Sequence, residues 1–103
     1  MNINLAFNTA EGTTVAGGFA LEQNQPNPFS TSTVIAFNMP TAATATLTVY
    51  NVSGKVLKVV SGEFAAGKNQ ITLNKDELTG SGMLYYQLDT PTDSATKKMI
   101  IID

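Results

Sequence analysis

Histidine and cysteine, the side chains that most often serve as catalytic bases, nucleophiles and zinc ligands, are absent from this sequence. Without them the chain cannot form a Cys–His or Ser–His nucleophile pair, a zinc site with imidazole or thiolate ligands, or a disulfide. Tryptophan and arginine are absent as well. We therefore predict that the chain is not an enzyme and that it has no catalytic residue, no metal site and no cofactor.

The carboxylates and glycines give only weak indications of a site. Of the eight acidic residues, Asp76 and Glu77 are the only adjacent pair, and neighbouring side chains in a loop point apart. A glycosidase-type pair could still assemble in space, but a solvated loop is the simpler interpretation. Segment 62–67 begins and ends with glycine, yet it lacks the Lys-Ser/Thr ending of a phosphate-binding loop.

Tyrosines are the remaining side chains with an evident binding chemistry. Tyr50, Tyr85 and Tyr86 could form a surface on which a planar ligand stacks. Aromatic rings in strands also pack in the core or against the sheet, and packing is what we expect here.

Composition and charge favour a small β-rich domain. The chain has 103 residues, of which 43% are hydrophobic and only 14% charged. Threonine and asparagine supply much of the remaining polarity, and they suit strand faces and turns better than helices. A net charge of −2 with six lysines argues against a nucleic-acid partner, which requires clustered cations. No apolar run is long enough to cross a bilayer, so we expect no membrane insertion.

Apolar and polar residues alternate along much of the chain, which is typical of half-buried strands. The alternation is clearest at 33–39 and 44–50, and Asn51 to Gly54 predict a turn with a positive φ at Gly54. Further strands are predicted at 55–60, 70–73, 83–89 and 96–102, and 74–82 has room for one helical turn at most. Short strands separated by turns indicate an all-β antiparallel sandwich. Its predicted core consists of Ile35, Phe37, Leu47, Val49, Val56, Ile71, Leu73, Tyr85, Leu88 and Met99.

The first 18 residues are predicted to belong to a different unit. Segment 2–8 alternates cleanly, and 9–18 has the composition of a flexible linker. A strand followed by a linker suggests the tail strand of a preceding domain, so we divide the chain into residues 1–18 and a domain of residues 19–103. The apolar face formed by Ile3, Leu5 and Phe7 predicts edge-strand pairing with another copy.

A series of short motifs runs from Leu21 to Ile102. It consists of the segments LEQNQPNPF (21–29), TVIAF (33–37), LTVYNVSGKV (47–56), AGKN (66–69), GMLYYQL (82–88) and TKKM (96–99). In order and spacing this series resembles the C-terminal sorting domains of the type IX (Por) secretion system of Bacteroidetes. The chain departs from the family pattern at Leu73, Leu84, Gln87 and Asp103.

The resemblance implies a seven-stranded, immunoglobulin-like sandwich that acts as a secretion signal. Fused cargo would pass through the periplasm and across the outer membrane to the cell surface or the medium, and the signal would usually be cleaved off. The implied partners are the outer-membrane type IX secretion machinery and a sortase-like peptidase. We expect the cut within residues 9–20, upstream of the domain.

The expected recognition surface centres on the last strand. Residues 97–102 place apolar side chains on both faces of the strand, an arrangement that is costly unless both faces are covered. One face should enter the core, while the other either docks on a partner or is enclosed within the domain. The positive charges of Lys97 and Lys98, the basic pair, would orient docking. The predicted site comprises Lys97, Lys98, Met99, Ile100, Ile101, Ile102, Gly82, Tyr85, Pro26, Asn27, Pro28 and Phe29.

One modification site is also predicted from a resemblance. Asp93-Ser94-Ala95 is similar to the Asp-Ser/Thr-apolar pattern of protein O-glycosylation in Bacteroidetes, and it falls in a predicted exposed turn. Ser94 is the candidate acceptor, with an ordinary turn as the alternative interpretation.

Two other functions remain open at the level of sequence. A carbohydrate-binding or adhesive sandwich would usually show an exposed aromatic platform or an acidic calcium cluster. A structural spacer domain of a larger exoprotein would have no need to lie at the C-terminus of its parent.

Overall fold

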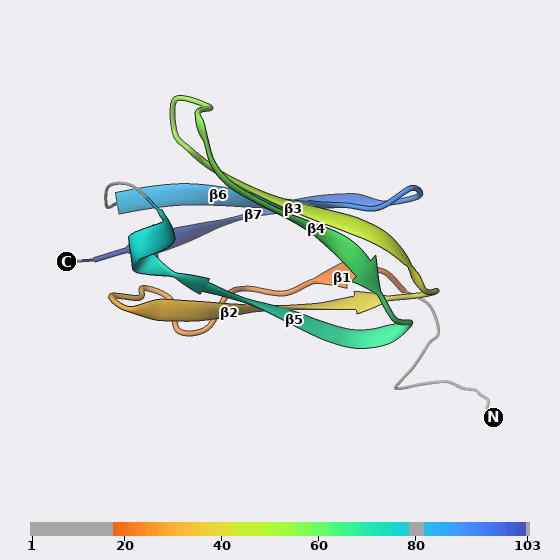
Figure 1. Cartoon of the computed structure of the whole chain (residues 1–103). Coiled ribbons are helices and arrows are strands. Elements are labelled where there is room, and N and C mark those ends of the chain that lie inside the picture. The colour runs from red at the N-terminus through yellow and green to blue at the C-terminus, as the bar shows by residue number, and fades with distance from the viewer. Residues whose placement is uncertain (1–17, 79–81, 103) are drawn as a thin grey trace.

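The structure, a computed structural model that describes residues 18–78 and 82–102, consists of two antiparallel β-sheets packed face to face (Figure 1). The smaller sheet has the order β1-β2-β5, with β1 at Ala20–Leu21, β2 at Ser32–Met39 and β5 at Gly67–Asn74. The larger sheet has the order β4-β3-β6-β7, with β4 at Val56–Phe64, β3 at Ala43–Asn51, β6 at Gly82–Asp89 and β7 at Ser94–Ile101. The expected seven-stranded, immunoglobulin-like sandwich is confirmed.

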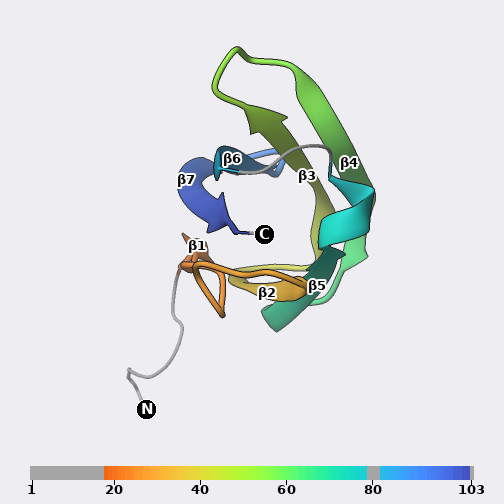
Figure 2. The same ribbon diagram turned by 90° about the vertical axis from the view of Figure 1, so that its left-hand side faces the viewer.

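The two sheets meet along the alternating apolar residues of their strands. Every second residue of β2, from Thr33 to Met39, is buried, and the same holds for β3 from Ala45 to Val49. Seen from the end of the sandwich (Figure 2), β1 and β7 lie together along one side, and β4 and β5 along the other. Eight of the residues predicted for the core are buried: Ile35, Phe37, Leu47, Val49, Ile71, Leu73, Leu88 and Met99.

The prediction for Val56 was wrong, because a β-bulge shifts the register between β3 and β4. Val49 pairs with Lys58, but the next residue, Tyr50, pairs with Val56 instead of Leu57. The extra residue moves Val56 to the outer face of the sheet, where 52% of it is exposed.

The prediction for Tyr85 was also wrong, since its neighbour Tyr86 occupies the core. Leu84, Tyr86 and Leu88 share the inward face of β6 and are buried. Tyr85 therefore faces outward, where its ring stacks on that of Tyr50 with the centroids 5.7 Å apart.

The predicted turns are formed by glycines in the conformation that the sequence requires. Gly54 has a φ of +90°, and its amide donates a hydrogen bond to the carbonyl of Asn51 at 2.9 Å.

In the connection after β5, one 3₁₀ turn, η2, spans Lys75–Glu77. The Glu77 carboxylate forms an ion pair with Lys58 at 3.3 Å and accepts the amide of Asn74 at 3.2 Å. Asp76 and Glu77 are both exposed, which agrees with a solvated turn.

Candidate functional site

The last strand, β7, has one buried and one exposed apolar face. Met99 and Ile101 are buried completely, with 0% and 1% exposed, whereas Ile100 and Ile102 are 40% and 48% exposed. The second alternative from sequence, a last strand enclosed on both faces, is therefore excluded within the described part of the domain. The outward face of β7 carries apolar surface that the domain itself leaves uncovered.

The two lysines at the centre of the predicted site lie on opposite faces of β7. Lys98 pairs with Tyr85 on the outer face and is exposed, whereas Lys97 pairs with buried Tyr86 on the inward face and is half-buried. Successive residues of a strand point to opposite faces, so the pair does not form one positive patch. Of these two lysines, only Lys98 contributes charge to the outer surface of the sheet.

Strands β6 and β7 bring most of the other predicted residues together. Met83 pairs with Ile100, and both are exposed on the outer face. Gly82 begins β6 opposite Ile101 with a φ of +96°. Only glycine adopts this φ without strain, which gives Gly82 a role in the backbone.

Residues 22–31, which connect β1 to β2 and are called the lead-in, lie along the outer edge of β7. The amide of Phe29 donates to the carbonyl of Ile100 at 3.0 Å, and its carbonyl accepts the amide of Ile102 at 2.9 Å. The side chain of Asn27 accepts the amide of Ile100 through Oδ1 at 2.9 Å, and that of Gln23 donates through Nε2 to the carbonyl of Lys98 at 2.7 Å. A backbone bridge and two amide side chains thus satisfy an edge that would otherwise be open.

The four predicted recognition residues of the lead-in, at positions 26–29, differ in their exposure. Pro26 and Pro28 follow cis peptide bonds and are exposed, as is Asn27. Phe29, in contrast, is only 1% exposed and belongs to the core. The predicted recognition residue Phe29 is thus not available at the surface of this structure.

A buried polar network fastens the lead-in to the sandwich. Asn24 and Thr33 are each 1% exposed, and Asn24 Nδ2 donates to Thr33 Oγ1 at 3.0 Å. The Tyr86 hydroxyl accepts the amide of Asn24 at 2.9 Å and donates to the carbonyl of Glu22 at 2.7 Å. Burial raises the pKa of the Tyr86 hydroxyl, although the hydrogen bond from Asn24 acts in the opposite direction. The sequence motif contains Asn24, but nothing in it signals that this asparagine is buried.

The candidate glycosylation site differs from its predicted setting. Ser94 is exposed, but it begins β7 instead of lying within the turn. Its hydroxyl donates to Asp89 Oδ1 at 2.7 Å, so modification would require this bond to break. Glycosylation of Ser94 stays a prediction.

Other classes of site have no counterpart in residues 18–78 and 82–102. No three acidic side chains there lie close enough together to hold a metal ion. In the same part of the chain, no helix has the length and apolar character needed to span a bilayer.

Comparison with known proteins identifies the family. The family model described as "Secretion system C-terminal sorting domain" matches residues 25–102, while no curated protein matches the chain. Among solved structures, dimeric latent PorU from Porphyromonas gingivalis superposes with a TM-score of 0.65 at 14% identity. The alignment covers 84% of this chain and 10% of that one, so the chain spans about a tenth of PorU, and the similarity shows the fold. Because the family model covers most of the chain, the chain belongs to the C-terminal sorting domains of the type IX secretion system.

Proposed function

We propose that the outer-membrane type IX machinery recognises this domain through the outward face of β7 and the adjoining part of β6. The family to which the chain belongs is one of sorting signals, and it implies export of the cargo to the cell surface or the extracellular space. The observation that supports this surface is the exposure of Ile100 and Ile102 beside fully buried Met99 and Ile101. Contiguous exposed apolar surface commonly marks a protein interaction site.

The proposed route takes the cargo through the periplasm, and a sortase-like peptidase then removes the domain. Strand β1 begins at Ala20, which pairs with Asn38 of β2. A peptidase requires an extended stretch of about ten accessible residues, so the cut should fall upstream of the paired strands. We propose that the cut falls within residues 9–20, most of which lie outside the described residues. Mass spectrometry of mature cargo should find its C-terminus there. A cut after buried Phe29 would contradict the proposal.

Residues 1–17 also lie outside the described part of the chain. The division into a tail of residues 1–18 and a domain of residues 19–103 therefore remains a proposal. So does pairing with another copy through Ile3, Leu5 and Phe7. The PorU structure is described as dimeric, which is a property of that protein.

The recognition proposal is tested by fusing the full chain to a periplasm-directed reporter in a bacterium with type IX machinery. We expect export with the domain and retention without it. Lys97→Glu combined with Lys98→Glu should slow export. The change at exposed Lys98 should cost only about 0–1 kcal/mol of stability, and circular dichroism of the double variant checks that the fold also tolerates the change at half-buried Lys97. If the folded double variant is exported at the normal rate, the basic pair has no part in recognition.

No catalytic role, cofactor or metal is included in this proposal. Membership of the sorting-domain family favours the signal function over a carbohydrate-binding, adhesive or spacer module. The O-glycosylation of Ser94 would be a separate property of exported material, and a peptide mass measurement on that material tests it.

A further inference from the structure

In the described part of the chain, exposed large hydrophobic side chains lie on the outer face of the larger sheet or just beyond one end of it. Among the described residues they are Val52, Val56, Val59, Met83, Ile100 and Ile102. Val56, Val59, Met83 and Ile100 lie on the outer face of the larger sheet, as their pairing shows. Val52 and Ile102 lie just beyond the ends of β3 and β7, at the same end of that sheet. None of the six lies on the smaller sheet, whose outer face along β5 carries Lys68, Gln70, Thr72 and Asn74.

The strand register makes these residues neighbours. On the outer face, Val56 pairs with Tyr50, Tyr50 with Tyr85, and Tyr85 with Lys98, so one row crosses all four strands. Met83 and Ile100 form an adjacent pair. Directly opposed side chains in antiparallel strands lie within contact distance. We call the surface formed by these eight apolar side chains (Tyr50, Val52, Val56, Val59, Met83, Tyr85, Ile100 and Ile102) the apolar half.

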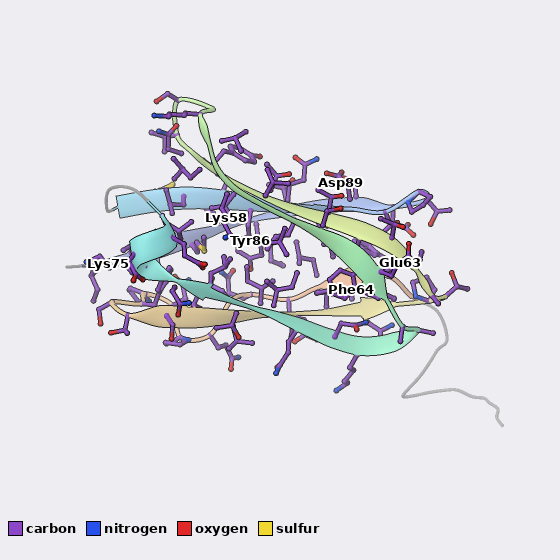
Figure 3. All side chains as sticks on the ribbon, viewed as in Figure 1. Lys58, Glu63, Phe64, Lys75, Tyr86 and Asp89 are labelled. Carbon is purple, nitrogen blue, oxygen red and sulfur yellow. The ribbon has the colours of Figure 1, made fainter. Side chains whose placement is uncertain are left out.

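Charge is separated along the same face. Lys98 lies in the row just described, and Lys55 lies in the β3–β4 turn; both are exposed, and neither forms an ion pair with any described residue. The acidic side chains Glu63 and Asp89 lie at the other end of the sheet, away from the β3–β4 hairpin tip (Figure 3). The outer face at that end of the sheet is polar: the Thr44 hydroxyl donates a hydrogen bond to the Glu63 carboxylate, and the Ser94 hydroxyl donates one to the Asp89 carboxylate. The apolar half is therefore flanked by positive charge, although the full chain has a net charge of −2.

We propose that the apolar half, together with Lys55 and Lys98, is a docking surface for a protein that presents aliphatic side chains bordered by carboxylates. The inference rests on the proposed function, since this protein would be a component of the secretion machinery. It extends the recognition surface from the last strand to the β3–β4 hairpin, none of whose residues belongs to the recognition site predicted from sequence. The carboxylates would pair with the two lysines and fix the orientation of docking.

Two other occupants fit the observations less well. An anionic membrane attracts clusters of about four to eight basic residues, whereas this surface has two in an acidic domain. A second copy related by a two-fold axis through the surface would bring the same lysines toward one another. An acidic protein surface avoids both conflicts.

The test replaces aliphatic side chains in the full chain fused to the periplasm-directed reporter. Val56→Thr, Val59→Thr and Ile100→Thr together retain β-branched side chains, which strands accommodate well. Each change replaces one aliphatic branch of the apolar half, a methyl in valine or an ethyl in isoleucine, with a hydroxyl. Export should fall at least about tenfold, because docking would bury three hydroxyl groups without hydrogen-bond partners and so weaken binding. Val34→Thr makes the same kind of change on the outer face of the smaller sheet, where Val34 pairs with Thr72, and should leave export unchanged.

Charge is tested separately with single variants that spare the apolar side chains. Lys98→Glu should slow export, whereas Lys98→Arg should not. If circular dichroism shows that the triple variant is unfolded, the two Lys98 variants still test the docking surface. Normal export by a folded triple variant, or by Lys98→Glu, would overturn the docking surface while leaving the sorting function intact. Failure of the unchanged domain to export the reporter would overturn both.

The chemistry of the partner is tested with a photo-reactive benzophenone amino acid in place of Ile100 during export. We expect a crosslink to a protein segment with aliphatic and acidic residues, and none from the same amino acid in place of Thr72. Changing the nearest carboxylate of that segment to lysine should then restore the export of Lys98→Glu. Crosslinks to lipid alone, to a second copy alone, or equally from both positions would overturn the proposal.

Discussion

Tyr86 and Asn24 lie 62 residues apart in the sequence, yet the amide of Asn24 donates a hydrogen bond to the Tyr86 hydroxyl at 2.9 Å. The same hydroxyl donates to the carbonyl of Glu22 at 2.7 Å. One side chain of β6 thereby satisfies two backbone groups of the lead-in. The lead-in in turn covers the edge of β7 through Phe29, Asn27 and Gln23. The buried Tyr86 hydroxyl thus holds the lead-in in place, and the lead-in covers the edge of the strand whose outward face is the proposed recognition surface.

Removal of the Tyr86 hydroxyl should loosen this connection without removing the ring. Tyr86→Phe leaves the amide of Asn24 and the carbonyl of Glu22 without their partner, a loss of about 1–3 kcal/mol for buried groups. For a domain of this size, each kcal/mol lowers the melting temperature by roughly 4–8 °C. Thermal denaturation followed by circular dichroism measures the change. Tyr85→Phe is the matched control, because the Tyr85 hydroxyl forms no hydrogen bond within the described residues and its loss should change stability by less than about 0.5 kcal/mol.

Alkaline pH should destabilise the domain through the same hydroxyl. Burial raises the pKa of Tyr86 above its ordinary value of 10.0, so above that pH the unfolded chain releases a proton that the folded domain retains. The free energy of unfolding is then unaffected by this group below pH 10.0 and falls as the pH rises toward the raised pKa. Urea midpoints at about pH 8 and about pH 11 should differ more for the unchanged domain than for Tyr86→Phe. Equal differences would show that Tyr86 does not titrate in this way.

The faces of the central strands could be predicted from sequence because period-two alternation is a local property. It assigns Ile35 and Phe37 to the core as directly as it assigns Leu47 and Val49. Val56 could not be placed in this way, because the bulge at Tyr50 adds one residue to β4 and reverses the face of every residue on its far side. The adjacent tyrosines pose a related problem, since either Tyr85 or Tyr86 could be the buried aromatic residue of β6. Only the shared spacing of Leu84 and Leu88 with Tyr86 assigns Tyr86 to the inward face.

The candidate site was predictable to the extent that motifs mark it. The motifs include β7 and the lead-in, and the structure places these two segments side by side. Their sequence does not show that Phe29 points into the core or that Asn24 is buried. It also does not show that Val56 and Tyr50 extend the surface of β7, because pairing across β3 and β6 depends on the tertiary register.

Asn27 should protect one particular amide of β7 from hydrogen exchange. Its Oδ1 accepts the amide of Ile100 at 2.9 Å, a bond that Asn27→Ala removes. Exchange at Ile100 should accelerate about fivefold, as expected for the loss of roughly 1 kcal/mol of local protection. Hydrogen exchange measured by NMR resolves this amide from that of Ile102, which donates to the carbonyl of Phe29 and should change less. Asn27→Asp keeps an acceptor at the same position and should preserve protection; unchanged exchange in Asn27→Ala would show that the side chain does not cover the edge.

Removal of residues 1–17 should leave the stability of the domain nearly unchanged. Among the described residues, the first backbone group that holds the chain to the sandwich is the carbonyl of Gly18, which accepts Asn38 Nδ2 at 2.7 Å. Strand β1 follows at Ala20–Leu21, and Leu21 is 8% exposed in the core. A chain that begins at Gly18 keeps these contacts, so its melting temperature should stay within about 3 °C of the full chain, equivalent to less than about 0.5 kcal/mol.

A chain that begins at Glu22 provides the contrast for this deletion. It loses β1 and the buried side chain of Leu21, which is a loss of about 2–5 kcal/mol when a core leucine is truncated. Thermal denaturation of the three chains under identical conditions separates the outcomes. A fall of roughly ten degrees or more in the chain that begins at Gly18 would show that residues 1–17 are an integral part of the domain. In that case the boundary of the sorting domain would have to be moved upstream, and a cut within residues 9–20 would destabilise the signal as it releases the cargo.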